Sequence, residues 1–310
     1  MKISVIIPIY NGEVHLARCL DSLATQSLSD IEFLLLDDGS TDKTRDLCNE
    51  YVSNDVRFKY FYHDNEGVSA TRNYGLEYAT GEYIAFCDCD DWADNDLYET
   101  LYSLAIQKDS DVAVVSFYDD FGTVVDDFYT RAMTGYDAWK MMLNNYSFSG
   151  FVWNKLFKRE LLSGMKFSSK LKLYEDMVFC GEAFGKANSV VFQNSQKYHY
   201  ISSFGRGKVR NGYETALDAC DILSSQSLEY FSQVLPELKA LYISTYVSVA
   251  NKGAVLGKLS KIDYEKYRDA IRNYNTSGIQ LNESIIKKIK LFNAGYFPFK
   301  LFCKLYARKQ

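Results

Sequence analysis

No run of about 18 apolar residues occurs in the chain, so the sequence predicts no helix that crosses a membrane. A secretory signal is missing as well. Apolar residues begin at once as a predicted strand, Ile3–Ile9, in place of the charged and apolar regions that such a signal contains. These two absences predict a cytoplasmic protein.

The cysteines lack the regular spacing of a disulfide framework or a zinc site. There are seven, an odd number, and they are scattered over positions 19, 48, 87, 89, 180, 220 and 303. Reduced thiols in a cytoplasm are the simplest interpretation. Cys87 and Cys89 lie two positions apart, but no second pair of Cys or His residues has matching spacing, which disfavours zinc.

Acidic residues are missing from the last part of the chain. Residues 284–310 hold seven basic residues and no acidic one, so the net charge of −5 divides into +7 there and −12 on the rest. The acidic body argues against nucleic acid as a partner. In Ile285–Arg308 the basic residues alternate with bulky apolar ones, which is typical of a segment lying on an anionic membrane. A packed C-terminal helix with a solvated basic side is the alternative.

The first part of the chain has the pattern of an α/β protein. Strands are predicted at 3–9, 31–36, 58–62 and 83–87, with helical patterns over about 14–24, 41–51 and 70–80 between them. Such alternation predicts a doubly wound, mostly parallel sheet with helices on both faces. In this fold all the parallel strands end at one rim, where ligands usually bind.

Polar residues follow three of these predicted strands. Tyr10 and Asn11 follow the first, Asp37 and Asp38 the second, and Asp88, Asp90 and Asp91 the last. Two carboxylates at positions i and i+2 can bind one Mg²⁺ or Mn²⁺ ion together. The alternative is an acidic turn that caps the next helix through Asp91 or Asp94. The first loop lacks the Gly-x-Gly-x-x-Gly pattern, which disfavours a dinucleotide site.

Three further residues are candidates for binding. Trp153 and Lys155 lie two apart, so an indole could stack on a sugar ring while the lysine reaches a phosphate or sugar oxygen. The alternative for Trp153 is a place in the core. His199 could complete a metal shell, or it could be an ordinary histidine that is satisfied within the protein.

Four motifs together resemble those of inverting glycosyltransferases of family 2, which have a GT-A fold. They are Pro8-x-Tyr10-Asn11, Asp37–Asp42, Gly67–Asn73 and Asp88-x-Asp90-Asp91. They occur in the family's order, specifically over residues 1–100 and more weakly to residue 205. The resemblance is to members that build bacterial capsule, exopolysaccharide and cell wall.

The resemblance implies a nucleotide-sugar site at the rim that includes Pro8, Tyr10, Asn11, Asp38, Arg72 and Asp88. Tyr10 would flank the base, Asp38 would hydrogen-bond to it, and Arg72 would lie near the base or the phosphates. Asp88 would lie by the ribose and the metal, and Asp90 would ligate the metal, Mn²⁺ or Mg²⁺.

The pair Glu175–Asp176 opens a predicted helix and could simply cap it. Inversion at a sugar carbon needs one carboxylate that takes the proton of the acceptor hydroxyl. The resemblance implies that Asp176 is this base and that Glu175 supports it or orients the acceptor. Residues 202–208 are glycine-rich and basic and could form a lid over the diphosphate. The family pattern is altered there, which leaves the roles of Arg206 and Lys208 open.

From about residue 211 only helices are predicted, at 213–235, 237–256, 263–274 and 282–292, the last capped by Asn282. We therefore expect a catalytic GT-A domain over 1–210 and an all-helical region over 211–310.

The function expected from these features is metal-dependent, inverting transfer of a sugar from a UDP-sugar to a saccharide acceptor. The acceptor is expected to be lipid-linked, in bacterial surface polysaccharide synthesis. The protein would then work in the cytoplasm, peripherally on the inner face of the plasma membrane, and a homo-oligomer is left open.

Two other functions fit the sequence less well. A nucleotidyltransferase would want a glycine-rich basic loop after the first strand, where Tyr10–Glu13 is acidic. A non-catalytic nucleotide-sugar-binding subunit would not need Asp176.

Overall fold

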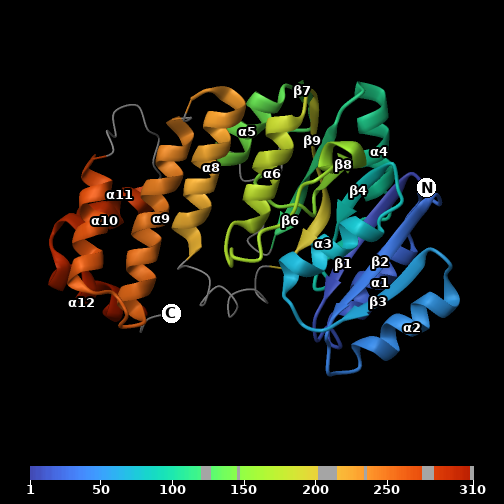
Figure 1. Ribbon diagram of the computed structural model, residues 1–310, viewed down its shortest axis with the longest axis horizontal. Coiled ribbons are helices and arrows are strands. Elements are labelled where there is room, and N and C mark those ends of the chain that lie inside the picture. Colours follow the sequence, from blue (N-terminus) through green and yellow to red (C-terminus); the bar gives the residue numbers. More distant parts are fainter. Residues whose placement is uncertain (120–126, 145–146, 202–214, 234–235, 274–282, 308–310) are drawn as a thin grey trace. The chain divides into compact units, whose positions relative to one another are not determined.

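The computed structural model describes the chain apart from residues 120–126, 145–146, 202–214, 234–235, 274–282 and 308–310 (Figure 1). The chain divides into two compact units. The first consists of residues 1–170 and 175–206, and the second of residues 171–174 and 207–310. The predicted boundary between residues 210 and 211, the predicted lid and the predicted cap Asn282 lie outside the described residues.

The first unit is built on one sheet, which has nine strands within the described ranges. The strands are β1 (Ile3–Ile9), β2 (Ile31–Asp38), β3 (Phe58–His63), β4 (Tyr83–Phe86), β5 (Trp92–Ala93), β6 (Val112–Asp119), β7 (Thr130–Met133), β8 (Lys155–Lys158) and β9 (Val190–Tyr200). Their order is β3-β2-β1-β4-β8-β6-β9-β5, and β7 also pairs with β9.

The first four strands are parallel, as predicted. β1 pairs with β2 on one side, with Ile3 opposite Ile31, and with β4 on the other, with Ile3 opposite Tyr83. The sequence did not predict β8, a strand of four residues that lies antiparallel between β4 and β6. β5 and β7 also run against β9. The sheet is therefore mostly parallel, with three strands reversed.

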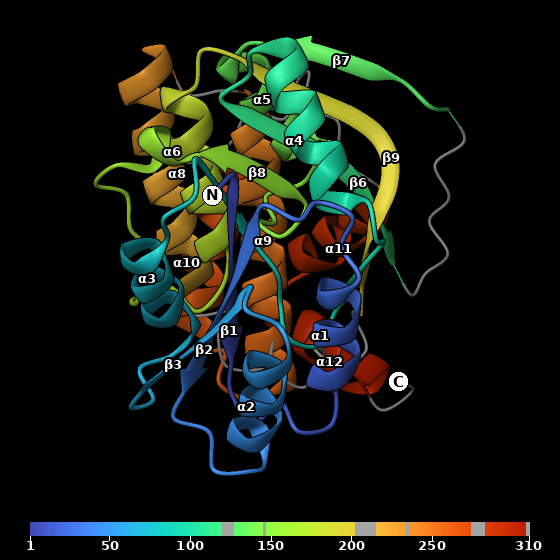
Figure 2. The same cartoon turned by 90° about the vertical axis from the view of Figure 1, so that its right-hand side faces the viewer.

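Helices cover both faces of this sheet. They are α1 (Leu16–Ala24), α2 (Thr44–Asn54), α3 (Val68–Tyr78), α4 (Leu97–Lys108), α5 (Gly135–Asn144) and α6 (Glu175–Lys186), with a 3₁₀ turn, η1 (Arg159–Leu162). On one face, Val5 and Ile7 of β1 pack in a core with Leu16 and Leu20 of α1. On the other, α3 lies so close to β1 that a side chain at Gly75 would collide with Ile6. Figure 2 shows α1 and α3 on opposite sides of β1.

The second unit consists of helices in the residues described. They are α8 (Ala216–Phe231), α9 (Pro236–Val255), α10 (Lys261–Asn273), α11 (Glu283–Asn293) and α12 (Tyr296–Ala307), coloured orange to red in Figure 1. The other four pack against α9. The sequence predicted the first four helices but not that α12 is a separate one. Within the described ranges, every helix is too short or too polar to span a bilayer.

Candidate active site

The loops after β1 and β2 are joined to each other at the rim of the sheet. Asn11 has a left-handed backbone, with φ of 50°, and its Oδ1 accepts a hydrogen bond from the Thr41 backbone N–H at 2.9 Å. Its own N–H donates to Ser40 Oγ at 2.9 Å. Asn11 therefore fixes the turn, and the neighbouring Tyr10 remains 51% exposed, available to flank a ligand.

Pro8 lies inside the buried strand β1. It is two residues beyond the last pair between β1 and β4, Ile6 and Phe86, so its missing N–H removes no hydrogen bond from that ladder. Pro8 thus leads into the turn that carries Tyr10, and its place in the nucleotide-sugar site stays a prediction.

Asp38 is buried at the end of β2, with 4% of its surface exposed. Its carboxylate accepts hydrogen bonds from the backbone N–H groups of Glu66, at 2.7 Å, and Gly67, at 3.0 Å. These groups lie just before α3, so Asp38 holds the start of that helix in place. A hydrogen bond that Asp38 accepts from the N–H of a base stays a prediction.

Arg72 gathers three acids around one buried cation. It lies on α3 and is 3% exposed. Its Nη2 is 3.0 Å from Asp88 Oδ1 at the end of β4. Its Nη1 is 2.5 Å from Asp176 Oδ1 and 3.6 Å from Glu175 Oε1, both at the start of α6. Three segments far apart in the sequence therefore meet at a single guanidinium group.

Local packing explains why Arg72 points inward. The side chain of the next residue, Asn73, donates to the Phe167 carbonyl at 3.0 Å and accepts from the Phe167 N–H at 2.8 Å. The Phe167 ring lies 5.3 Å from the Arg72 guanidinium and stacks on Phe179 of α6 at 3.9 Å. The sequence offered no signal for Phe167, which connects α3 to α6 behind the charged cluster.

The environment of Asp176 suits a base that works near neutral pH. Burial raises the pKa of its carboxyl to about 8, and the negative charges of Glu175 and Asp88 add to this effect. The positive charge of Arg72 acts in the opposite direction but does not outweigh burial. In the ligand-free protein, Asp176 therefore releases its proton close to pH 8.

The acidic strand end divides into accessible and buried carboxylates. The Asp88 side chain is 28% exposed and Asp90 is half-buried, whereas Asp91 is only 1% exposed. Asp91 accepts hydrogen bonds from Tyr198 Oη at 2.9 Å and from the Ile201 N–H at 2.8 Å, and burial raises its pKa. Asp91 thus anchors the end of β9. It does not cap α4, whose N-cap position is Asp96.

Asp88 and Asp90 are the acids of this strand end that remain accessible to a metal ion bound together with a diphosphate. Among the described residues, no group of three or more His, Cys, Asp or Glu side chains could hold a metal. Mg²⁺ commonly takes only one or two carboxylates and completes its shell with phosphate oxygens and water. Asp88 and Asp90 could supply these one or two carboxylates. The described residues do not form a complete ligand set that would hold a metal without the nucleotide.

His199 does not belong to this metal position. Its ring is stacked between Trp92, at 4.7 Å, and Tyr118, at 4.5 Å. Its Nε2 is 2.8 Å from Asp94 Oδ1. The prediction of His199 as a metal ligand is therefore corrected to the alternative, a histidine satisfied within the protein.

Arg18 of α1 is a candidate that the sequence did not indicate. It is exposed, its Nη2 donates to the backbone carbonyl of Asp90 at 2.7 Å, and its guanidinium lies 4.0 Å from the centre of the Trp92 ring. It therefore places a positive charge beside Asp90. Because the two residues are 72 positions apart, no local pattern reveals this contact.

The Trp153–Lys155 prediction is wrong, because both side chains are buried. Trp153 is 1% exposed and is stacked between Phe151, at 4.8 Å, and Tyr198, at 4.4 Å. Lys155 is fully buried, and its Nζ donates to the carbonyls of Phe148, at 2.8 Å, and Phe151, at 2.7 Å. Burial lowers the pKa of Lys155 to about 8. Neither side chain can reach a sugar or phosphate from this position.

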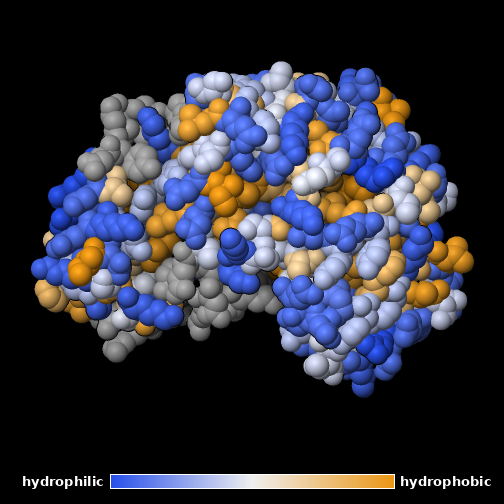
Figure 3. Space-filling view, in the orientation of Figure 1, coloured by the Kyte–Doolittle hydropathy of each residue, from blue (hydrophilic) through white to orange (hydrophobic). Residues whose placement is uncertain are grey.

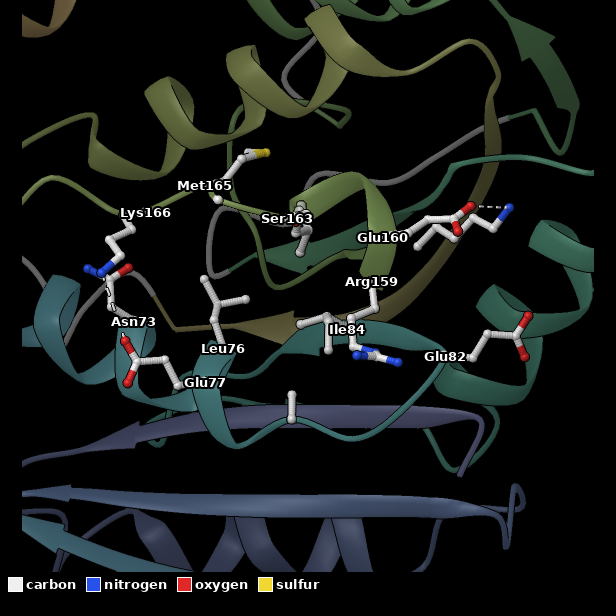
Figure 4. A pocket seen from close by; sticks show the side chains of 14 residues that line it. Asn73, Leu76, Glu77, Glu82, Ile84, Arg159, Glu160, Ser163, Met165 and Lys166 are labelled. Carbon is white, nitrogen blue, oxygen red and sulfur yellow. Dashed lines mark ion pairs between the residues drawn. The ribbon is translucent and has the colours of Figure 1, made fainter.

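A pocket of about 750 Å³, separate from the carboxylate rim, is lined by Asn73, Leu76 and Glu77 of α3 (Figure 4). Its lining includes the apolar residues Leu76, Ile84 and Met165 and the ion pairs Lys166–Glu77 and Lys158–Glu160. None of the predicted site residues lines it. We therefore place the candidate site at the carboxylate rim and not in this pocket.

A mostly parallel sheet with acids at its strand ends, and with an acid pair on the helix beyond, is the arrangement of GT-A-type glycosyltransferases. The family model for glycosyl transferase family 2 matches residues 4–167, slightly more than half of the chain. The chain belongs to this family.

Curated relatives and solved structures agree with this assignment. GlyA, a glycosyltransferase of Streptococcus pneumoniae serotype 4, is 33% identical over 64% of this chain, and the match spans 30% of GlyA. EpsH of Bacillus subtilis (strain 168), a glycosyltransferase by assignment, is 30% identical over 86% of this chain and 81% of EpsH. TarS 1–349 of S. aureus, in complex with UDP-GlcNAc, superposes with a TM-score of 0.59 at 19% identity, covering 100% of this chain and 93% of TarS 1–349. The likeness to TarS shows the fold.

Proposed function

We propose that this glycosyltransferase is inverting and metal-dependent, and that it transfers a sugar from a UDP-sugar to a saccharide acceptor in bacterial surface polysaccharide synthesis. One observation carries the proposal. Arg72 joins the accessible acid at the end of β4, Asp88, to Asp176 at the start of α6. A donor held at Asp88 would therefore lie one guanidinium group away from a carboxylate that can accept a proton.

The residues would divide the reaction between two sides of the sugar. On one side, Asp88 and Asp90 would hold the diphosphate end of the donor, where a bound Mn²⁺ or Mg²⁺ would supply charge neutralisation. On the other, Asp176 would take the proton of the acceptor hydroxyl while Glu175 orients the acceptor. The acceptor oxygen forms a bond to the anomeric carbon as the bond to the diphosphate oxygen breaks. Attack opposite the leaving group inverts the anomeric carbon.

The donor can be identified by testing UDP-sugars one at a time with Mn²⁺ and measuring UDP release. We expect that one UDP-sugar, or a small group of them, is consumed with formation of UDP. TarS has been captured with UDP-GlcNAc, which supports starting with this donor. The absence of UDP formation from every donor, together with pyrophosphate formation from UTP and a sugar phosphate, would favour a nucleotidyltransferase instead.

The proposed metal should bind only together with the nucleotide. Asp90→Asn removes one of two expected ligands, so we expect UDP release to fall by about 100-fold or more. We also expect Mn²⁺ to raise the melting temperature of the wild-type protein only when UDP is present, and the variant to lose this effect. Asp46→Asn, at an exposed position on α2, is the matched control. Unchanged turnover in Asp90→Asn would remove the metal claim.

The pKa of Asp176 predicts how the rate depends on pH. Only the ionised carboxylate can accept a proton, and kcat/KM reports the ionisation of the free enzyme. Because burial raises this pKa to about 8, kcat/KM should rise with pH and level off above that value. The slope below it should be about tenfold per pH unit. A profile that is flat from about pH 6 to 8 would show that another group is the base.

We further propose that the acceptor is lipid-linked and that the protein works at the inner face of the plasma membrane. This part is supported by the lysine-rich, aromatic sequence of residues 285–308. Its test is the product itself. An acceptor extracted with the bacterial lipid should become radiolabelled from the donor sugar, and labelling only of water-soluble glycans would contradict a lipid-linked acceptor.

A further inference from the structure

Helix α12 is apolar on two opposite faces. Its inner face contributes Phe299 and Cys303, which are 1% and 3% exposed, to the core of the second unit. Its outer face carries Phe297 and Leu301, which are 75% and 61% exposed, and Phe302, 46% exposed, lies at the side of the helix between the two faces. Phe297 and Leu301 are four positions apart and so lie above one another on the helix. A helix that only packed on the protein would carry polar residues on the outer face.

The charged residues of α11 and α12 beyond Glu283 are all of one sign. Lys287 and Lys290 are exposed on α11, and Lys300 of α12 lies with its Nζ 3.0 Å from Tyr296 Oη. No acidic residue occurs from position 284 to 310. Bulky apolar side chains accompanied by lysines, and by no acids, are complementary to a bilayer with an apolar hydrocarbon region and anionic headgroups.

The neighbouring helix α10 provides the contrast within the same unit. It exposes Ile262, at 79%, but this residue is followed by Asp263 and Glu265. Acids beside an apolar residue are repelled by an anionic surface. The side of α10 and α12 that is turned to the viewer in Figure 3 is mostly hydrophilic, with small orange groups. Exposed apolar residues are therefore not general in this region, and those of α12 are distinguished by their basic setting.

We propose that the outer face of α12, formed by Phe297 and Leu301 with Phe302 at its side, inserts into the interface of an anionic lipid bilayer. The lysines of α11 and α12 contact its headgroups. With 12 residues, the helix is too short to span a bilayer and lies along its surface. The two explanations of the C-terminal sequence are then both correct, each for one face of the helix. The purpose of the surface rests on the proposed function, because it brings the enzyme to a lipid-linked acceptor.

The full chain is tested by sedimentation with phosphatidylglycerol vesicles, and with phosphatidylcholine vesicles for comparison. We expect the wild-type protein to sediment with the anionic vesicles and not with the neutral ones, and to be released as salt is raised. The double variant Phe297→Ser/Leu301→Ser should lose at least about tenfold in vesicle affinity. Ile262→Ser, which removes an equally exposed apolar side chain from α10, should sediment like the wild type.

Two further measurements make the outcome decisive. All three substitutions are at exposed positions, so the melting temperatures should remain close to that of the wild type. UDP release in the absence of vesicles should be unchanged in the double variant, and Asp176→Asn should still sediment. These measurements distinguish a failure of the proposed catalytic function from a failure of the proposed membrane binding.

Three results would overturn the proposal. They are equal sedimentation of the double variant and the wild type, equal binding of the wild type to neutral vesicles, and a change from dimer to monomer in the double variant without loss of vesicle binding. The last would assign the face to contact between copies of this chain.

Discussion

Asp176→Asn should abolish sugar transfer while donor binding and folding are retained. An amide has the size of the carboxylate but cannot accept the proton of the acceptor hydroxyl, so kcat should fall by about 10²–10⁴-fold. Folding should change little, because burial raises the pKa of Asp176 to about 8 and the side chain is already largely uncharged at pH 7. The measurements are kcat by UDP release, UDP affinity by calorimetry and the melting temperature.

Glu175→Gln is the matched control for this variant. Glu175 is the preceding residue and lies 3.6 Å from the same guanidinium nitrogen, compared with 2.5 Å for Asp176. If it only orients the acceptor, its loss should raise KM more than it lowers kcat. Normal kcat in Asp176→Asn with a large loss in Glu175→Gln would move the role of base to Glu175.

Arg72→Met should destabilise the protein by about 3–5 kcal/mol, because it removes a buried cation and leaves its carboxylate partners uncompensated. The charged partners are Asp88 and Glu175, which approach from two other segments of the chain, whereas Asp176 is largely uncharged at pH 7. The free energy of unfolding in urea at pH 7 measures this cost. Arg45→Met, at an exposed position on α2, is the matched control and should change stability far less.

The cost of Arg72→Met should also depend on pH in a definite direction. The ion pairs exist only while the acids are ionised, so the difference between variant and wild type should shrink as the pH falls and the carboxyls take up protons. Arg72→Lys keeps the charge but cannot present two separate nitrogens to Asp88 and Asp176. Its free energy of unfolding should therefore lie between those of the wild type and Arg72→Met. Wild-type stability in Arg72→Met would show that the cluster does not hold the site together.

The order of the first strands could be predicted from the sequence because the information is local. β1 and β2 are buried along their whole length, and a continuous apolar run followed by a polar turn is the pattern of such strands. β8 was missed for the opposite reason. It has four residues and a lysine at each end, and it is a strand only because β4 and β6 lie on either side of it.

The residues of the candidate site could be predicted where they lie in sequence motifs. They could not be predicted where burial determines whether a side chain is accessible to a ligand. Asp88, Arg72 and Asp176 come together as a set. Lys155 was misplaced because its burial is compensated by backbone carbonyls of a loop, which no side-chain pattern reveals. His199 was misplaced because its partner, Asp94, is 105 positions away.

The most direct test of the account is a crystal structure of the protein with UDP and Mn²⁺. The account predicts uracil at the rim beside Tyr10 and Asp38, the metal between the diphosphate and the Asp88 and Asp90 carboxylates, and the terminal phosphate directed toward the side where Arg72 holds Asp176. UDP bound in the pocket behind α3, or a metal that contacts neither Asp88 nor Asp90, would contradict it.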